Sequence, residues 1–342
     1  MRFGLFDHMD RSGEDTSAQY ETRLQILEAC DRAGFYSYHL AEHHGTPLGL
    51  APSPSVFLAA AAQRTKTLRL GALVFTLSLY HPLRLLDELC MLDHLSNGRL
   101  DVGIGRGISP IELGFYGVVP EESPAIFQEV TEILLKGFVS NELSHRGKHF
   151  TFDKVPIELR PHQRPMPPLW YGLGRPESLD WVASRGINVI GNGPAALVRR
   201  VTDRYRAIWK EAGKSDATLP KMGIGRHMII ADTDAEAREL ARPAYKQWVD
   251  NLLLLWRKHN IPPTAHFPED FEAADAAGVC LVGSLATVRD KLRAHVQDAG
   301  VNYMLCRVAY GNLPKEASLR TVEYMRREIM PMFAEGKAAA AE

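Results

Sequence analysis

The sequence lacks the features that mark several classes of protein. No apolar run approaches the roughly 20 residues that cross a membrane, and we expect no signal peptide at the N-terminus. The net charge of the 342-residue chain is −1, which gives no electrostatic basis for binding nucleic acid or a membrane surface. The four cysteines are scattered without a Cys-x-x-Cys pair, so we expect reduced thiols in a cytoplasmic protein.

What is present is typical of one folded domain. Hydrophobic residues make up 45% and charged residues 24% of the chain, as in an ordinary globular protein. The length is normal for a single barrel, so it does not require a second domain. We expect one domain over residues 1–335, followed by a frayed, alanine-rich tail over 336–342.

Apolar segments with strand periodicity alternate along the chain with segments of helical periodicity. Strands are expected at residues 3–6, 36–40, 68–76, 100–105, 169–173, 187–190, 223–231 and 303–308. Helices are expected at 20–34, 54–64, 82–95, 124–139, 177–184, 195–212, 234–258, 284–297 and 315–330. Three surface excursions interrupt this order, at about 106–123, 144–168 (where a hairpin fits) and 260–278. Eight strand–helix units predict parallel strands, and they fit a closed (β/α)₈ TIM barrel better than an open sheet.

One of these strands carries the first functional signal. In residues 100–105, apolar side chains alternate with Asp101, Gly103 and Gly105. If the apolar side chains face the helices, Gly103 and Gly105 leave empty space on the other face, where a large flat ligand can bind. Arg106 at the strand's end can hold an anion through paired hydrogen bonds. The alternative is a buried strand whose glycines only relieve crowding, with Arg106 as a surface charge.

A Glu-His-His sequence follows the second strand, at the end of the barrel where active sites lie. Adjacent histidines at a strand end point in different directions, so at most one of His43 and His44 is expected to face the barrel mouth. That histidine can exchange protons near neutral pH, and the neighbouring Glu42 can set its tautomer. The alternative is that both histidines are hydrogen-bonded to loop backbone.

Metal ligands are a further possibility at the same rim. Asp7, His8, His43 and His81 can in principle supply ligands from several strands. The chain has no His-x-His on the first strand and no His-Glu-x-x-His on a helix. We therefore expect no metal site, and a metal-dependent barrel hydrolase remains only as an alternative.

A glycine turn after the fifth strand leads into a helix and suggests a phosphate site. Free N–H groups at Gly174 and Arg175, with the hydroxyl of Ser178, can bind a phosphate. Together with Arg106 on the adjacent strand, they form a two-sided anion site. The alternative is an ordinary helix start with an exposed Ser178.

Several ordered motifs resemble those of the bacterial luciferase-like monooxygenase family of flavin-dependent oxidoreductases. The most specific are Ala41-Glu42-His43-His44, His81-Pro82-Leu83-Arg84 and the run from Leu92 to Gly107. The resemblance extends almost from end to end, from Met1 to Phe333. It implies a (β/α)₈ barrel with insertions that binds reduced FMN at the strand ends and pairs as a homodimer.

The resemblance also implies roles for particular residues. His43 occupies the position of the family's catalytic histidine, with Glu42 beside it. A non-proline cis peptide under the flavin ring is implied at Leu73–Val74. The residues expected to border that ring are Gly105, Ile108 and Ser109. The groups expected to hold the FMN phosphate are Arg106 and Ser178, helped by the backbone of Gly174 and Arg175.

Some positions depart from the light-emitting subunit of the family. That subunit has a cysteine where this chain has Gly105, a tyrosine at Ser109, and Glu-Ser where this chain has Gly174-Arg175. These departures argue against luminescence and aldehyde specificity, although not against flavin binding. Arg175 would add a second positive charge near the phosphate.

The leading hypothesis is a two-component flavin monooxygenase. A separate flavin reductase supplies reduced FMN, O₂ oxygenates a small apolar organic substrate, and His43 acts as general acid/base. Alternatives are hydride transfer with a reduced deazaflavin, which the Glu-His-His motif disfavours, and a non-catalytic flavin-binding or scaffold subunit. The excursions at 106–123 and 260–278 are candidate lids. Five aromatic residues can line a substrate pocket or pack in the core or lid: Phe115, Tyr116, Trp170, Trp256 and Phe267.

Overall fold

The computed structural model describes residues 1–173, 178–263 and 268–335. Within these ranges, eight parallel strands close into a barrel, and the pairings of β1 with β11 and of β8 with β9 complete the ring. The barrel strands, in their order around the ring, are β1 (Arg2–Asp7), β2 (Ser37–Leu40), β3 (Arg69–Thr76), β4 (Leu100–Gly105), β7 (Leu169–Gly172), β8 (Asn188–Gly191), β9 (Met222–Ala231) and β11 (Tyr303–Arg307). The predicted (β/α)₈ barrel is confirmed.

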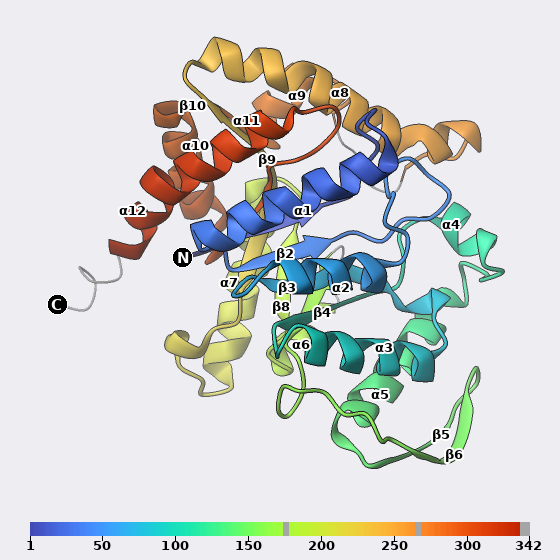
Figure 1. Ribbon diagram of the computed structural model, residues 1–342. Coiled ribbons are helices and arrows are strands. Elements are labelled where there is room, and N and C mark those ends of the chain that lie inside the picture. The colour runs from blue at the N-terminus through green and yellow to red at the C-terminus, as the bar shows by residue number, and fades with distance from the viewer. Residues whose placement is uncertain (174–177, 264–267, 336–342) are drawn as a thin grey trace.

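Helices surround this barrel, as Figure 1 shows. They are α1 (Thr16–Ala33), α2 (Pro54–Arg64), α3 (Pro82–Leu95), α4 (Pro110–Phe115), α5 (Ser123–Val139), α6 (Leu179–Ser184), α7 (Ala195–Glu211), α8 (Asp234–Lys258), α9 (Phe271–Ala276), α10 (Leu285–Ala299), α11 (Lys315–Tyr324) and α12 (Met330–Glu335). Short 3₁₀ turns occur at Leu77–Leu79 and Asp216–Thr218, and a π-helical turn at Met325–Ile329 joins α11 to α12.

Local sequence signals explain where these helices begin and end. The carboxylate of Asp15 caps α1 by accepting a hydrogen bond from the backbone N–H of Ser17. Gly34 ends that helix in the left-handed conformation, with φ of 82°. Thr233 caps the long helix α8, since its hydroxyl oxygen accepts a hydrogen bond from the backbone N–H of Glu236.

The excursions contain elements of their own. The hairpin of β5 (Glu142–Arg146) and β6 (Thr151–Pro156) projects from the barrel at the lower right of Figure 1. Helices α4 and α9 lie in the first and third excursions and were not predicted.

Strand β10 (Cys280–Ser284) was also missed, because the sequence analysis left its residues between the excursion 260–278 and the helix expected from residue 284. It pairs only with the second half of β9, which runs on past its pairing with β11. The strands were predicted from the eightfold alternation of strand and helix. A five-residue strand outside the barrel is not part of that alternation.

The inner face of β4 is filled, although open space was expected there. A Cβ built on Gly103 would lie 2.1 Å from the carbonyl oxygen of Ala72, and one on Gly105 would lie 2.2 Å from a methyl group of Val74. The prediction that these glycines leave room for a ligand is therefore wrong: β3 approaches β4 so closely that only glycine fits at Gly103. The apolar residues of β4 do face the helices, where they pack against α5.

Candidate active site

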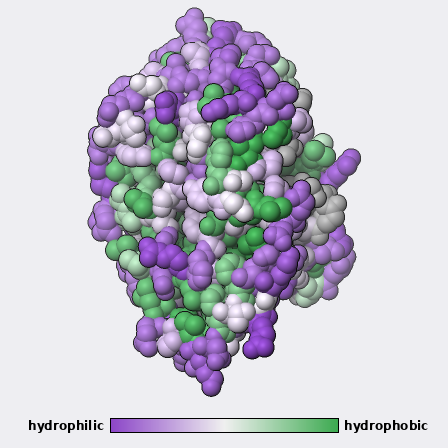
Figure 2. All heavy atoms as spheres, turned by 90° about the vertical axis from the view of Figure 1, so that its right-hand side faces the viewer, coloured by the Kyte–Doolittle hydropathy of each residue, from purple (hydrophilic) through white to green (hydrophobic). Residues whose placement is uncertain are grey.

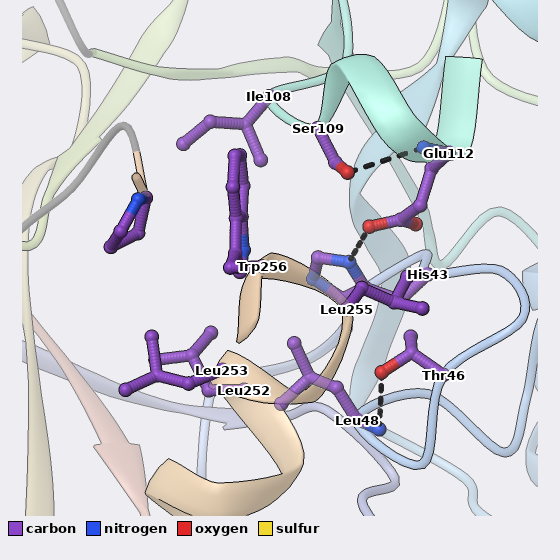
Figure 3. A pocket seen from close by; sticks show the side chains of 11 residues that line it. His43, Thr46, Leu48, Ile108, Ser109, Glu112, Leu252, Leu253, Leu255 and Trp256 are labelled. Carbon is purple, nitrogen blue, oxygen red and sulfur yellow. Dashed lines mark hydrogen bonds and ion pairs between the residues drawn. The ribbon is translucent and has the colours of Figure 1, made fainter. Parts of the chain in front are cut away.

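A pocket opens at the carboxyl ends of the barrel strands, beside α4 and α8. Its empty volume is about 500 Å³ when the open solvent at its mouth is included. Most of its wall is apolar, and His43 and Glu112 are its ionisable residues (Figure 3). The lining residues are His43, Thr46, Leu48, Ile108, Ser109, Glu112, Leu252, Leu253, Leu255, Trp256 and Pro263.

His43 is held by Glu112, a residue that the sequence analysis did not single out. The Nδ1 atom of His43 lies 3.1 Å from Oε1 of Glu112, and the other carboxylate oxygen accepts a 2.8 Å hydrogen bond from the backbone N–H of His44. Burial alone raises the pKa of Glu112, but these hydrogen bonds outweigh it and lower that pKa. An ionised carboxylate only accepts, so in the neutral imidazole Nδ1 carries the proton and Nε2 is the basic nitrogen.

The position of Glu112 follows from the start of α4. Ser109 is the N-cap of this helix, and its hydroxyl oxygen accepts a 3.2 Å hydrogen bond from the backbone N–H of Glu112. Both side chains line the pocket, as Figure 3 shows. A serine followed three residues later by a glutamate is a sequence signature of a helix start, so this signal would have located Glu112.

Glu42 does not contact His43. One carboxylate oxygen accepts a 2.8 Å hydrogen bond from the Nε2 of His44, and the other accepts hydrogen bonds of 2.9 Å from the N–H of Thr76 and the hydroxyl of Tyr80. The side chain of Glu42 is 1% exposed. The expectation that Glu42 sets the tautomer of His43 is therefore wrong, because Glu42 is fully engaged with groups behind the pocket wall.

The two adjacent histidines point in different directions, as expected. His43 lines the pocket, whereas the ring of His44 lies between Glu42 and Tyr116, whose hydroxyl is 2.8 Å from its Nδ1. Tyr116 follows the last residue of α4. The short helix is thus attached to the rim at both ends, through Glu112 and Tyr116.

The residues expected to border a flavin ring lie near one another. The Leu73–Val74 peptide is cis, as the resemblance implied. The side chain of Val74 lies against Gly105. Among the described residues, a Cβ built on Gly172 would meet Val74 alone, at 3.9 Å. The neighbouring Ile108 and Ser109 line the pocket itself.

The residues expected to hold a phosphate lie at the ends of two paired strands. Arg106 follows β4 and is exposed, and Ser178 comes after β7, which pairs with β4. The hydroxyl of Ser178 accepts a 3.4 Å hydrogen bond from Tyr171. Gly174 and Arg175, also expected here, lie outside the described residues.

Of the aromatic residues considered for a substrate pocket, Trp256 lines it and faces Ile108 in Figure 3. Trp170 is fully buried inside the barrel, and Phe267 lies outside the described residues. Phe115 and Tyr116 are 50% and 53% exposed. Figure 2 views the side of the molecule on which α4 lies and shows hydrophobic residues exposed over the middle of that face.

The other rim histidines are engaged in packing. The ring of His8 stacks on that of His43 at 5.8 Å, and the ring of His81 lies edge-on to Phe150 at 5.7 Å. In the ranges that the structure describes, no group of three or more His, Cys, Asp or Glu residues is placed to hold a metal ion. A search of the same residues finds no helix long and apolar enough to cross a membrane.

Comparison with known sequences identifies relatives along the whole chain. Residues 1–303 match the family described as "Luciferase-like monooxygenase". The uncharacterized protein y4wF of Sinorhizobium fredii is 48% identical over 332 residues, which are 96% of each chain. The oxygenase component of the flavin-dependent trigonelline monooxygenase of Acinetobacter baylyi is 29% identical, over 98% of this chain and 97% of that protein.

Solved structures give the same result for the fold. The monooxygenase RslO1 from Streptomyces bottropensis superposes with a TM-score of 0.88 at 27% identity, covering 97% of this chain and all of that one. The oxygenating constituent of 3,6-diketocamphane monooxygenase from Pseudomonas putida, solved in complex with FMN, has a TM-score of 0.79 at 21% identity, covering 97% of this chain and 98% of its own.

Proposed function

The chain belongs to the luciferase-like monooxygenase family of flavin-dependent oxidoreductases, and we propose that it is the oxygenase component of a two-component flavin monooxygenase. A separate flavin reductase supplies reduced FMN, and the other substrates are O₂ and a small, largely apolar organic compound. The observation that carries this proposal is the His43–Glu112 pair in the wall of a largely apolar pocket. The pair supplies one placed proton-transfer group in a site that excludes water.

The residues at the rim suit FMN. The described residues leave a Cβ on Gly172 free of close contacts beside Val74, and this is where we place the flat ring. The residues that would border the ring are Leu73, Val74, Gly105, Ile108 and Ser109. The guanidinium of Arg106 and the hydroxyl of Ser178 have the chemistry for the phosphate. The backbone N–H groups of Gly174 and Arg175, which lie outside the described residues, remain part of the proposed phosphate site. Reduced FMN, when bound, supplies the electrons for the reaction with O₂.

The chain's own residues position a proton and exclude water. His43 gives or takes a proton at Nε2, because ionised Glu112 keeps the other ring nitrogen protonated. Glu112 is thus a positioning residue. Glu42 acts one step further away, since it fixes His44 and the backbone at Thr76. The leucines of α8 and Trp256 belong to the apolar wall. Helix α4, in the first candidate lid, opens and closes the site, whereas residues 264–267 of the other candidate lid lie outside the described residues.

We further propose that the chain pairs as a homodimer in the cytoplasm. Helices α2 and α3 pack side by side and expose three large apolar residues: Val56 at 72%, Met91 at 54% and Leu95 at 48%. A second copy would cover them. The four cysteines are free and buried, which suits a reducing compartment. Light scattering on the eluting protein tests the pairing, and a monomeric mass at micromolar concentration would contradict it.

An anaerobic titration tests the cofactor. We expect saturable binding of reduced FMN, weaker binding of reduced riboflavin, which lacks the phosphate, and loss of this preference in Arg106→Met. Rapid mixing of the complex with oxygenated buffer is then expected to give an oxygen-dependent transient in flavin absorbance that His43→Ala alters. Binding of a reduced deazaflavin alone, without an oxygen-dependent transient, would instead support the hydride-transfer alternative. If neither binds, the flavin proposal fails.

A further inference from the structure

A buried arginine lies at the barrel mouth without an acidic partner. Arg307, the last residue of β11, is 4% exposed. Its guanidinium lies over the ring of Phe6, with 4.8 Å between Cζ and the ring centroid, and one terminal nitrogen donates a 3.0 Å hydrogen bond to the side-chain oxygen of Asn192. Within residues 1–173, 178–263 and 268–335, its Nε has no hydrogen-bond partner. Among the described residues, no carboxylate forms an ion pair with Arg307.

The guanidinium faces the inside of the barrel. Arg307 is the register partner of His227 on β9, and side chains at paired positions of parallel strands point to the same face. A Cβ built on Gly225, two residues before His227, would lie 3.3 Å from Arg307 and 2.3 Å from the Asn192 oxygen. Phe6, beneath the guanidinium, belongs to the apolar cluster that fills the barrel interior. Arg307 therefore lies on top of that cluster.

A second buried donor lies beside it without a partner. In the part of the chain that the structure describes, neither ring nitrogen of His227 has a hydrogen-bond partner, and the residue is fully buried. Burial lowers the pKa of His227, and the charge of Arg307 lowers it further, so the imidazole is neutral and donates one N–H. Burial also lowers the pKa of Arg307, to about 10, which leaves the guanidinium charged at neutral pH. The site thus has unused donors and one uncompensated positive charge, an arrangement that is costly without a ligand.

The ring of His8 lies between the pocket residue His43 and the region of Arg307 and His227. His43 lines the pocket, and the ring of His8 stacks on it at 5.8 Å. Burial lowers the pKa of His8, and the charges of Arg307 and His43 lower it further. The ring of His8 also lies edge-on to that of Phe6 at 4.8 Å, and Phe6 is the ring over which the guanidinium of Arg307 lies.

Resting on the proposed function, we infer that the organic substrate carries a carboxylate and that Arg307 is the residue that binds it. A carboxylate has acceptors only, and it can accept from the unpartnered Nε of Arg307 and from the N–H of His227. It also balances the buried charge, while the apolar pocket holds the rest of the molecule. Arg307 is then a specificity-determining residue, and the uncharged form of the same substrate binds more weakly.

Calorimetric titration of the FMN-saturated protein tests this inference. The probes are benzoate and cyclohexanecarboxylate, each compared with its uncharged amide. We expect the carboxylates to bind roughly tenfold to a hundredfold more tightly than the amides. We expect Arg307→Met to abolish that preference and Arg307→Lys to restore part of it. Equal affinity of acid and amide for the wild-type protein would overturn the inference, whether or not any variant folds.

Arg226 offers a matched control. It precedes His227, so it faces away from the barrel interior, and its terminal nitrogens donate to the backbone oxygens of Gly225 and Gly193. Arg226→Met removes the same buried charge and should leave the carboxylate preference intact. Reduced FMN binding is measured in each variant. If Arg307→Met weakens reduced FMN but not benzoate, the anion is the flavin ring and the substrate inference fails. If wild-type protein does not bind FMN, the proposed function itself fails.

Discussion

Replacing Glu112 by glutamine separates the charge of this side chain from its shape. Glu112 accepts hydrogen bonds from the His43 ring and from the backbone N–H of His44. The glutamine oxygen can keep the backbone contact, and the amide N–H₂ then faces the ring. Because an amide N–H can only donate, Nδ1 of His43 must become the acceptor, and the proton moves to Nε2. The variant therefore changes the tautomer without emptying the site.

The size of the effect follows from this geometry. A hydrogen bond to a charged group contributes about 1.5–3 kcal/mol. The side chains of His43 and Glu112 are 17% and 13% exposed, and one of the two contacts survives, so we expect a loss of about 1–2 kcal/mol and a decrease in Tm of a few degrees. Loss of the basic Nε2 should slow the proton-transfer step by roughly 10²–10⁴-fold.

The dependence on pH has a defined sign. The folded-state pKa of Glu112 lies below its ordinary value of 4.5, so the carboxylate contributes stability above about that pH and loses it as the pH falls through the folded value. The stability difference between wild type and Glu112→Gln should therefore shrink as the pH falls below about 4.5.

Histidine ¹⁵N spectra report the tautomer directly, and His43→Ala assigns the signal. Reoxidation of bound reduced FMN by O₂ is followed by stopped flow. Glu112→Asp is the matched control, since it keeps the charge and shortens only the reach. Unchanged tautomer and unchanged reoxidation in Glu112→Gln would refute the reasoning.

Three further substitutions test other parts of the structure. Gly103→Ala should destabilise the fold by at least about 3 kcal/mol in urea denaturation, because its Cβ would lie 2.1 Å from a backbone oxygen; Gly172→Ala, where the space is open, should cost little, and equal losses would contradict the packing argument. Tyr116→Phe removes the hydroxyl that is hydrogen-bonded to His44. We expect it to lower the free energy of unfolding by about 1 kcal/mol, which is measured as a decrease in Tm. An unchanged Tm would mean that this hydrogen bond does not stabilise the fold. Burial raises the pKa of Asp10 to about 6 from 3.8, so folding favours the protonated form and stability falls as the pH rises from about 4 to 6. Asp10→Asn should remove this decrease in stability and raise the free energy of unfolding at pH 8 by about 3 kcal/mol. An identical pH dependence of stability in wild type and variant would contradict this role of Asp10.

The barrel was predictable because its signals are local and repeated. The predicted bounds of α2, α3 and α8 agree with the structure to the residue. Two of these helices begin at a proline, and Thr233 caps the third. The elements that were missed, β10, α4 and α9, lie outside the eightfold repeat. Strand β10 depends on β9 running past the barrel, and α4 depends on its contacts with the rim.

The site was predictable in its residue types but not in its pairings. A histidine after β2 was expected to face the mouth, and His43 does. Its partner is 69 residues away in the sequence, so proximity along the chain favoured Glu42, which faces elsewhere. The space expected beside Gly103 is likewise filled by a neighbouring strand. Such pairings depend on how the loops at the rim fold against one another. The spacing of residues within one strand holds no information about that arrangement.

The extension of β9 beyond the barrel also bears on how this protein can diversify. Its second half pairs with β10, and α8, which lines the pocket, packs against both strands. The connection between α8 and β10 thus begins and ends on elements that pack against each other beside the closed barrel. Insertions or deletions in that connection can reshape the pocket wall without changing the register of any barrel strand. In descendants of one ancestral barrel, selection for new substrates is therefore expected to act on this segment first.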